Sequence, residues 1–556
     1  ITVIILVPWQ SSAELNANLS TRLLEIPFVD LRYPGLSADG NWAAFPARDA
    51  GGKWHLYFMN TSGGEHRAIT TDSFNVISSA DVSSDGSRVV FDAVSPGATN
   101  VDIYVTSALG GGTRVIAQGA FLPRWQPDGK RVFFTRGIYA NTKSKSRKLE
   151  IWSVGPDGTN ERLEFIDSIS VSGYLSLSLS PDNRSIAWMR TFTQGGSQEI
   201  FVRDLVTGTE HQLTFDKKSI DEVCWAPNNQ IIFSSNRSGN TNLWMIPSGG
   251  GTEVQITKGS GPDLGMKISA DSKKLLYYQN QFTSDFWVGS MVTGVAQQIT
   301  FDDRIKVQPV LSPDGTLIAF AAGSSDPLKA SSAVIVTNRD GSNRRQITSN
   351  DETGGQPRWA PDGRSIAYTV VKRDSAGYIK SYVSEIGKPG APKFVGDGVA
   401  FMWSDPQHLL LVVPSPPRTF IASIETGEVK QFFEDSTSAF PVSGGKYVFD
   451  RDLRRGREGR WVVEVNASFE PKGSPRKILG PVETIISPRA DCLIYQKSPG
   501  ELWRLSLPSG KEEKIPGSFP GFTFGGNSSL NPDTKEIIYT KVRSQGKLVM
   551  IENLFK

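Results

Sequence analysis

A short hairpin motif recurs along this chain and constrains its fold more than any other feature. It reads WQPDGKRVFF, LSPDGTLIAF and WAPDGRSIAY in three of its copies. In the Ser-Pro-Asp-Gly form the serine hydroxyl can form a hydrogen bond with the backbone of the turn, and proline restricts φ at the second position. Aspartate and glycine are favoured at the third and fourth positions of a type I turn. After the turn, Ile366, Tyr368 and Val370 recur with period two, which predicts a β-strand.

The copies of this motif are spaced by about 45 residues, a period typical of β-propellers with one four-stranded blade per repeat. Three eroded copies lie near Pro406, Gly444 and Arg489. The clear copies have their third turn residue at Asp39, Asp85, Asp128, Asp182, Asn228, Asp271, Asp314, Asp362 and Asp533.

A second signal follows most copies of the hairpin, in the form of a short strand with an aromatic residue at a fixed place. It is present in the eroded copies too, which identifies them as blades. A Gly-rich turn and an outer strand ending in Ile/Leu-Thr complete the repeat. These aromatic residues are Tyr57, Tyr104, Trp152, Phe201, Trp244, Trp287, Tyr382, Phe420, Trp461 and Trp503.

Each repeat therefore predicts four antiparallel strands, and the fold class is all-β with tandem β-propellers. Twelve blades exceed the usual four to eight of one ring, so two six-bladed rings are the simplest division. We expect a first propeller at 21–300 and a second at 301–556, preceded by a linker at 11–20. The tryptophans before the turns, Trp125, Trp225 and Trp359, should pack between blades.

The two ends of the chain leave a second arrangement open. The last copy ends at KLVMIENLFK without a fourth strand, and TRLLEIPF near the start resembles a fourth strand without a blade. If the first segment completes the last blade, both ends meet in one ring and the other ring is an insertion. The alternative is an open last blade.

Composition limits the function classes. Charged residues make up 21% and the net charge is +3, without the basic excess of a nucleic-acid binder. The two cysteines, Cys224 and Cys492, exclude a disulfide framework. Residues 1–10 begin with the apolar run ITVIILVPW, which we interpret as the remnant of a transmembrane helix or signal peptide; a short buried strand is the alternative.

The hairpin, the aromatic strand and the closing Gln/Arg-Ile/Leu-Thr together resemble the TolB-type WD40-like propeller repeat. The same repeat class occurs in tricorn-like propellers and is similar to the N-terminal propellers of dipeptidyl-peptidase-like enzymes. The resemblance covers the chain from about Leu24 onward. It implies the fold strongly and the function weakly, because this repeat serves many roles.

We expect no enzyme activity, no catalytic residues, no metal site and no cofactor in this chain. The Gly-x-Ser-x-Gly elbow of an α/β-hydrolase is missing from the sequence. The four histidines, His55, His66, His211 and His408, form no spaced pair for zinc.

Two sets of polar residues are candidates for binding. Five near the starts of inner strands would line the axial mouth and hold a ligand or peptide, the alternative being a solvated rim: Arg124, Lys267, Gln308, Gln356 and Arg358. At this mouth, charge reversal of Arg124 or Arg358 should weaken capture without lowering the melting temperature. A second set follows the outer strands and would attract a cation or basic partner, or else cap its own turns: Asp72, Asp216, Asp302, Asp303, Asp351 and Glu352.

The leading hypothesis is an extracytoplasmic, non-enzymatic binding or sensor module that docks a protein, peptide or small ligand. Similar propeller arrays follow a membrane span in bacterial receptor Ser/Thr kinases and membrane-bound regulators, so a membrane tether is expected at the N-terminus. The alternatives are a periplasmic TolB-like envelope protein and the non-catalytic propeller of a peptidase or hydrolase. No nucleic-acid partner is expected, and the sequence leaves the oligomeric state open.

Overall fold

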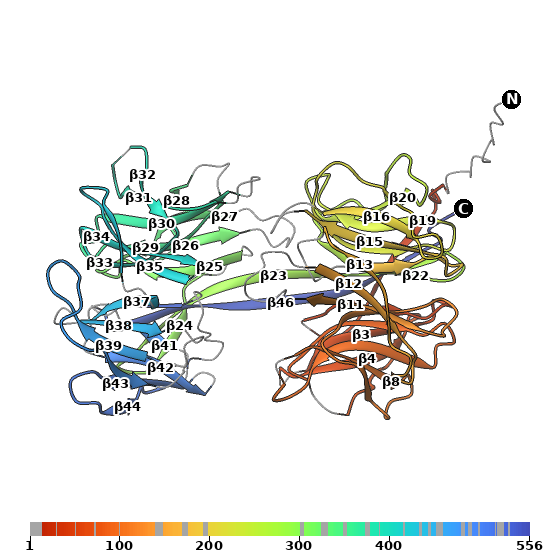
Figure 1. Ribbon diagram of the computed structural model, residues 1–556, viewed down its shortest axis with the longest axis horizontal. Coiled ribbons are helices and arrows are strands. Elements are labelled where there is room, and N and C mark those ends of the chain that lie inside the picture. Colours follow the sequence, from red (N-terminus) through yellow and green to blue (C-terminus); the bar gives the residue numbers. More distant parts are fainter. Residues whose placement is uncertain are drawn as a thin grey trace. The chain divides into compact units, whose positions relative to one another are not determined.

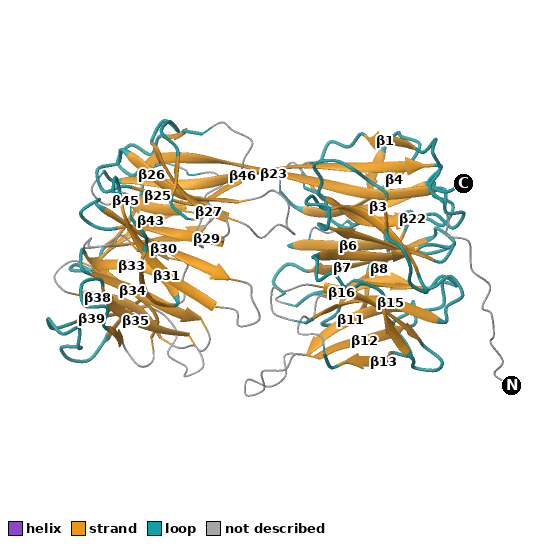
Figure 2. Cartoon of the chain, turned by 90° about the horizontal axis from the view of Figure 1, so that it is seen from above, coloured by secondary structure: helices purple, strands orange, loops and turns teal. Residues whose placement is uncertain are grey.

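The computed structural model describes residues 14–556 except for a set of short segments. These are 29, 50–51, 72–73, 99, 139–147, 170–175, 193–197, 301–304, 324–331, 349–352, 373–377, 389, 415–416, 433–435, 443–445, 452–459, 480–483, 487–491, 499–500, 518, 520–527 and 532–533. The described part consists of strands and connecting turns and contains no helix, so the predicted all-β class is confirmed (Figure 2). None of its segments is a helix able to span a membrane. The apolar run Ile1–Trp9 lies outside the described residues.

The chain divides into two compact units, and most of its strands form four-stranded antiparallel sheets, here called blades (Figure 1). Among the described residues, unit 1 comprises those up to Gln281 and those of Ser544–Lys556. Five of its blades follow the chain: β2 (Gly35–Leu36), β3 (Trp42–Arg48), β4 (Trp54–Asn60), β5 (His66–Ala68); β6 (Val76–Val82), β7 (Arg88–Val94), β8 (Asp102–Ser107), β9 (Arg114–Ala117); β10 (Phe121–Trp125), β11 (Val132–Ile138), β12 (Lys148–Val154), β13 (Arg162–Asp167); β14 (Leu177–Leu179), β15 (Ser185–Thr191), β16 (Gln198–Asp204), β17 (Glu210–Gln212); and β18 (Ile220–Trp225), β19 (Gln230–Ser235), β20 (Asn242–Pro247), β21 (Val254–Gln255).

Unit 2 comprises Phe282–Ser325 and Ala330–Arg543. Its consecutive blades are β25 (Ile305–Leu311), β26 (Leu317–Gly323), β27 (Ser332–Asn338), β28 (Arg345–Gln346); β29 (Thr353–Trp359), β30 (Ser365–Lys372), β31 (Tyr378–Glu385), β32 (Lys393–Asp397); β33 (Val399–Asp405), β34 (His408–Pro414), β35 (Pro417–Ser423), β36 (Val429–Gln431); β37 (Ser436–Val442), β38 (Lys446–Arg451), β39 (Arg460–Glu464), β40 (Arg476–Leu479); and β41 (Thr484–Ile486), β42 (Cys492–Ser498), β43 (Glu501–Ser506), β44 (Glu512–Lys514).

The remaining six strands form one sheet to which both units contribute. They are β1 (Ser20–Leu24), β22 (Asp263–Ile268), β23 (Lys274–Ser290), β24 (Ala296–Gln298), β45 (Ser528–Asn531) and β46 (Glu536–Glu552). The first half of β23 pairs with β22 and its second half with β24, while β46 pairs first with β45 and then with β1. The chain therefore passes from one unit to the other inside β23 and returns inside β46.

This strand exchange decides the question that the chain ends left open. The N-terminal strand β1 pairs with the end of β46 from Ser20↔Glu552 to Leu24↔Leu548. It is therefore the fourth strand of the unit 1 blade that also contains β22, the first half of β23 and the end of β46. Unit 2 is then an insertion between two parts of unit 1. The two compact units thus differ from the predicted propeller ranges 21–300 and 301–556, because residues 282–300 lie in unit 2 and residues 544–556 lie in unit 1.

The innermost strands of each unit contact one another in sequence. In unit 1, β2, β6, β10, β14, β18 and β22 contact in this order, and β22 contacts β2, which closes a cycle. In unit 2, β45, β25, β29, β33 and β37 contact in this order, and β41 contacts β45.

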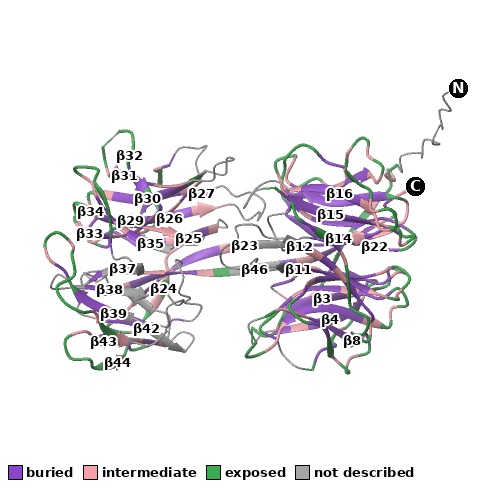
Figure 3. Ribbon diagram, in the orientation of Figure 1, coloured by how far each residue is buried: buried purple, intermediate pink, exposed green. Residues whose placement is uncertain are grey.

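The cores lie between neighbouring blades, as the repeat predicts, and buried residues follow the strands (Figure 3). One cluster joins Val90 and Ile103 of one blade to Trp125 and Phe134 of the next. Trp125, Trp225 and Trp359 are all buried, which confirms their predicted place between blades.

The recurring turn has the predicted chemistry. At Ser312, the hydroxyl oxygen accepts a hydrogen bond from the Leu317 backbone N–H at 2.9 Å, and Gly315 N–H donates to the Ser312 carbonyl at 2.8 Å. The same hydroxyl donates to Asp314 Oδ1 at 2.6 Å. These bonds fix the hairpin locally, which explains why so short a motif can be repeated.

Candidate functional site

Charged side chains from three innermost strands meet in the middle of unit 1. Arg124 Nη2 of β10 donates to Glu222 Oε1 of β18 at 2.5 Å, and Lys267 Nζ of β22 donates to the same oxygen at 3.3 Å. All three residues are buried, Glu222 completely. Because a whole blade separates β10 from β18, the Arg124–Glu222 contact reaches across the interior of the cycle.

Two further carboxylates belong to this group. Asp81 Oδ2 accepts a hydrogen bond from the Trp125 backbone N–H at 2.8 Å, and Asp92 Oδ2 accepts one from Leu122 N–H at 3.1 Å. Burial raises the pKa of Asp81, although Lys267 and Arg124 oppose the shift. Burial also raises the pKa of Asp92, against the hydrogen bonds that it accepts. We call Asp81, Asp92, Arg124, Glu222 and Lys267 the axial cluster.

The axial cluster compensates the charge of Arg124 but leaves two of its polar atoms free. Burial lowers the pKa of Arg124, yet Glu222, Asp81 and Asp92 together outweigh burial, so the pKa lies above its usual value. Within the described residues, Arg124 Nε and Glu222 Oε2 have no hydrogen-bond partner. A buried donor and a buried acceptor without partners are costly unless something binds them.

Unit 2 places the other three predicted residues on its innermost strands. Gln356 N–H of β29 donates to Gln308 Oε1 of β25 at 2.6 Å, so these two residues tie neighbouring blades together. Arg358, also on β29, donates from Nε to the Phe401 carbonyl at 2.7 Å and from Nη1 to the Pro357 carbonyl at 2.9 Å. Its guanidinium is thus held by backbone carbonyls.

Arg124 and Arg358 occupy the same repeat position, directly before the inner-strand tryptophan, but their surroundings differ. Among the described residues no carboxylate forms an ion pair with Arg358, whereas Arg124 has Glu222. Burial lowers the pKa of Arg358 to about 10, which leaves it protonated at neutral pH. Unit 2 therefore holds, on an innermost strand, a partly buried cation that no carboxylate of the described residues pairs.

Of the acidic set, only Asp216 lies within the described residues. It is exposed, and its Oδ1 lies 3.4 Å from Arg237 Nη2, so its charge is already paired. The other members are outside the described residues: Asp72, Asp302, Asp303, Asp351 and Glu352.

The histidines lie apart and serve local contacts. His55 Nε2 is 3.4 Å from Asp49 Oδ2, His211 Nε2 is 3.1 Å from the Ser248 carbonyl, and His408 Nδ1 is 2.9 Å from Asp405 Oδ2. His66 packs edge-on against Phe28. Among the described residues, no three His, Cys, Asp or Glu side chains are placed to hold a metal ion together.

Sequence reasoning found Arg124 and Lys267 but missed the carboxylates that join them. A signal was present, because Asp221 and Glu222 in IDEVCW and Asp81 in ISSADV place carboxylates on inner strands whose other residues are apolar or small. A charged residue at such a place must find a partner inside the ring. The sequence cannot say which one, since the contact joins residues of blades that are not neighbours.

The fold and its repeats define a β-propeller protein. Residues 128–388 match the family described as the TolB beta propeller domain, which confirms the resemblance to TolB-type repeats over this stretch. The chain is 30% identical over 149 residues to a Protein TolB homolog of Chlorobium chlorochromatii (strain CaD3), covering 27% of this chain and 32% of that protein. It is 29% identical over 135 residues to a Protein TolB homolog of Chlorobaculum tepidum, covering 24% and 29%.

The chain thus spans about a third of the length of the curated relatives it matches. Among solved structures, the crystal structure of the tricorn protease is similar with 12% identity and a TM-score of 0.35, over 93% of this chain and 61% of that one.

Proposed function

We propose that this chain is a TolB-like, non-enzymatic binding module that docks a protein or peptide at the innermost strands of its propeller units. The observation that carries the proposal is the guanidinium of Arg358, partly buried and without a carboxylate among the described residues. Holding such a charge costs folding free energy, so a partner that supplies an acidic group is a reason to keep it.

The axial cluster of unit 1 favours a neutral polar group as its ligand, in place of an acidic one. Its charges are largely compensated, and its free atoms are one donor, Arg124 Nε, and one acceptor, Glu222 Oε2. A neutral peptide group offers one acceptor and one donor and matches this pair. We therefore assign anionic groups to unit 2 and neutral polar groups to unit 1.

We propose an extracytoplasmic location for this module. The matched relatives are named TolB homologs, which favours a free TolB-like envelope protein over the sensor part of a membrane-bound kinase. Under either alternative the partner is a protein or peptide, and neither a cofactor nor a nucleic acid takes part.

The test uses two labelled peptides of matched length, Gly-Glu-Glu-Gly and Gly-Gln-Gln-Gly, titrated into the full chain at pH 7 and followed by fluorescence anisotropy. We expect the acidic peptide to bind more tightly and Arg358→Gln to remove this preference. Arg364→Gln, which removes an exposed arginine of the same blade, is the control and should change nothing. Equal binding of both peptides, or an unchanged preference in Arg358→Gln, contradicts the proposal. Hydrolysis of peptide or ester substrates by the purified chain contradicts the non-enzymatic assignment.

A further inference from the structure

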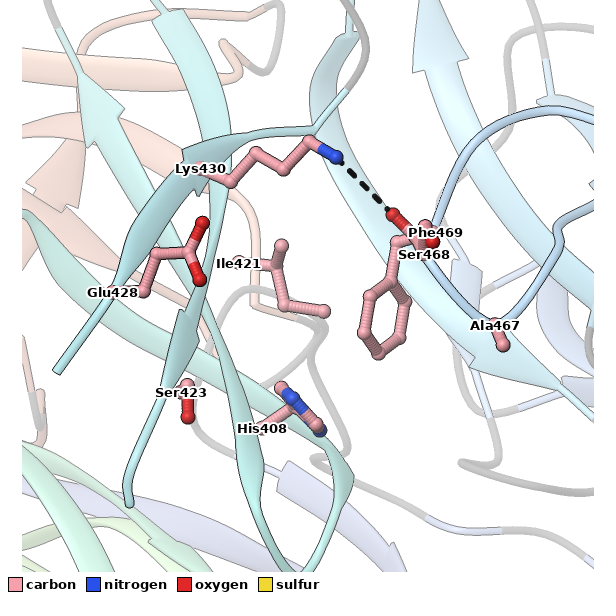
Figure 4. A pocket seen from close by; sticks show the side chains of 8 residues that line it. All are labelled: His408, Ile421, Ser423, Glu428, Lys430, Ala467, Ser468 and Phe469. Atoms are coloured by element: carbon pink, nitrogen blue, oxygen red, sulfur yellow. Dashed lines mark hydrogen bonds between the residues drawn. The ribbon is translucent and has the colours of Figure 1, made fainter. Parts of the chain in front are cut away.

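A cavity of about 280 Å³ lies in unit 2 between the blade β33–β36 and the blade β37–β40, and its described lining includes neither Arg358 nor any residue of the axial cluster. Its walls come from His408 at the start of β34, Ile421 of β35, Glu428 and Lys430 around β36, and the turn that ends in Phe469 (Figure 4). The volume is near the lower limit for small-molecule pockets, which are typically ~300–1,000 Å³, so it suits a single side chain.

Phe469 has a backbone conformation that phenylalanine rarely adopts. Its φ is 61°, and Phe469 N–H donates to the Asn466 carbonyl in the turn between β39 and β40. The equivalent positions in two other blades are Gly158 and Gly341, with φ of 84° and 85°. A side chain in this left-handed region costs roughly 1–2 kcal/mol relative to glycine, so the ring is placed here at the expense of local strain.

The Phe469 ring faces the cavity and is held there by its neighbours. It meets His408 edge-on with a centroid distance of 4.9 Å, and it packs against the interblade core that contains Ile421 and Phe432. Figure 4 shows the ring directed toward the space bounded by Ile421, Glu428 and His408. One wall of the cavity is therefore an aromatic ring supported by a buried core.

The carboxylate of Glu428 is the one charged group in the described lining that has no partner. Lys430 Nζ donates to the Ser468 carbonyl at 3.4 Å and lies 3.9 Å from Glu470 Oε1. The His408 ring is held by Asp405.

The described lining of the cavity holds one carboxylate, that of Glu428, and one ammonium group, that of Lys430. The Lys430 ammonium is engaged by the Ser468 carbonyl and lies near Glu470, so the Glu428 carboxylate is the charged group of the lining that is open to a ligand. A free carboxylate beside an aromatic face in such surroundings suits a cation.

We propose that this cavity binds the guanidinium of an arginine side chain on a peptide or protein partner, with Glu428 as its counter-ion and the Phe469 ring as its stacking face. The planar guanidinium donates two parallel hydrogen bonds to a carboxylate and stacks on aromatic rings, which an ammonium group does not do as well. The described lining of this site does not include Arg358, and the site would bind a cationic group, whereas Arg358 would bind an anionic one.

The experiment titrates acetyl-Gly-Arg-Gly-amide and acetyl-Gly-Gln-Gly-amide into the full chain by isothermal calorimetry. We expect only the arginine peptide to bind, and Glu428→Gln to weaken it about tenfold or more. Glu425→Gln removes the same charge from the same hairpin outside the lining and should change the Kd less than about twofold. Phe469→Gly suits the backbone and removes the ring, so it should also lose affinity while keeping a cooperative melt.

Several outcomes would overturn the proposal. These are no binding of the arginine peptide to the wild-type chain, equal loss in Glu425→Gln and Glu428→Gln, or tighter binding of acetyl-Gly-Glu-Gly-amide, which would make Lys430 the recognition group. Arg358→Gln serves to separate the two sites. It should leave the arginine peptide unaffected, so failure of the proposed function and failure of this site give different results.

Discussion

Arg124 Nη2 lies 2.5 Å from Glu222 Oε1, and both side chains are buried on innermost strands of blades that are not neighbours. From its place in the repeat, Arg124 was expected to line the axial mouth, where reversing its charge would weaken capture without lowering the melting temperature. The structure places it inside the axial cluster. Reversing the charge at this position should therefore change the stability of unit 1 as well as its binding of a partner.

We expect Arg124→Glu to destabilise unit 1 strongly. The new carboxylate would face Glu222, Asp81 and Asp92 with only Lys267 to compensate, and breaking a buried ion pair typically costs about 3–5 kcal/mol. Chemical denaturation followed by tryptophan fluorescence measures the loss. Lys130→Glu reverses a charge on an exposed side chain of the same blade and is the control. Equal stability of both variants would mean that Arg124 is not paired inside the ring.

The substitutions Arg124→Met and Arg358→Met remove the same charge at equivalent repeat positions, and they should affect stability to different extents in the two units. Arg124→Met leaves the buried carboxylates of Glu222 and Asp92 and the partly buried carboxylate of Asp81 short of a cation. Arg358→Met removes a charge that no described carboxylate compensates. We expect the first variant to lower the melting temperature clearly more than the second. Differential scanning calorimetry makes the comparison, and a larger loss in Arg358→Met would contradict the contrast.

The pH dependence of Arg358 follows from its pKa of about 10, which is below the usual 12.5. Between pH 7 and 9 the group is protonated in both the folded and the unfolded state, so the cost of burying its charge is fully present. As the pH rises through 10, the folded state releases the proton first and the cost falls. The stability of wild type relative to Arg358→Met should therefore be constant from pH 7 to 9 and rise above pH 10. A flat difference up to pH 11 would show that the charge carries no such cost.

Trp359→Ala should cost about 3–5 kcal/mol, because the ring is buried in an interblade cluster with Val310 and Tyr368 and its removal leaves a cavity. Its Nε1–H also donates to the Val310 carbonyl at 3.3 Å. Thermal melting detects the change. Trp42→Ala, at a partly exposed tryptophan, should cost much less. A Trp359→Ala melt within a degree of wild type would show that the assigned register is wrong.

A chain of residues 14–300 should aggregate or melt without cooperativity. It lacks the end of β46, so β23 and β1 lose their shared neighbour and leave open sheet edges. Joining residues 14–281 to residues 544–556 by a Gly-Ser linker restores that strand. We expect the joined chain to be monomeric and to melt cooperatively, as judged by light scattering and calorimetry. The strand exchange is contradicted if the 14–300 chain behaves in the same way.

Much of the fold was predictable because the information is local. The turn at Ser312, the alternation after it and the aromatic strand each depend on residues a few positions apart, and many copies reinforce one another. The eroded copies also form blades, and their third strands carry the expected aromatic residues Phe420, Trp461 and Trp503. The sequence left open whether TRLLEIPF completes the blade that KLVMIENLFK leaves without a fourth strand, and the pairing of β1 with β46 decides that it does.

The candidate site was predictable only in part. The sequence indicated polar residues on inner strands and the equivalence of Arg124 and Arg358, because both precede a tryptophan in the repeat. It did not reveal that Glu222 forms an ion pair with Arg124, while no carboxylate in the described part of the chain does so with Arg358. Nor did it indicate the Phe469 cavity, because Phe469 stands in a turn whose backbone normally requires glycine.

The sequence by itself determined the all-β class, the four-stranded repeat and the burial of the tryptophans, since a hairpin and its alternating faces are set by neighbouring residues. Only the tertiary structure decided which strand halves share a blade and which charges meet. Strand exchange between β23 and β46 joins segments more than 200 residues apart, and the Arg124–Glu222 contact spans 98 residues. Such pairings depend on how the chain closes in space, and no local pattern of residue types encodes that closure.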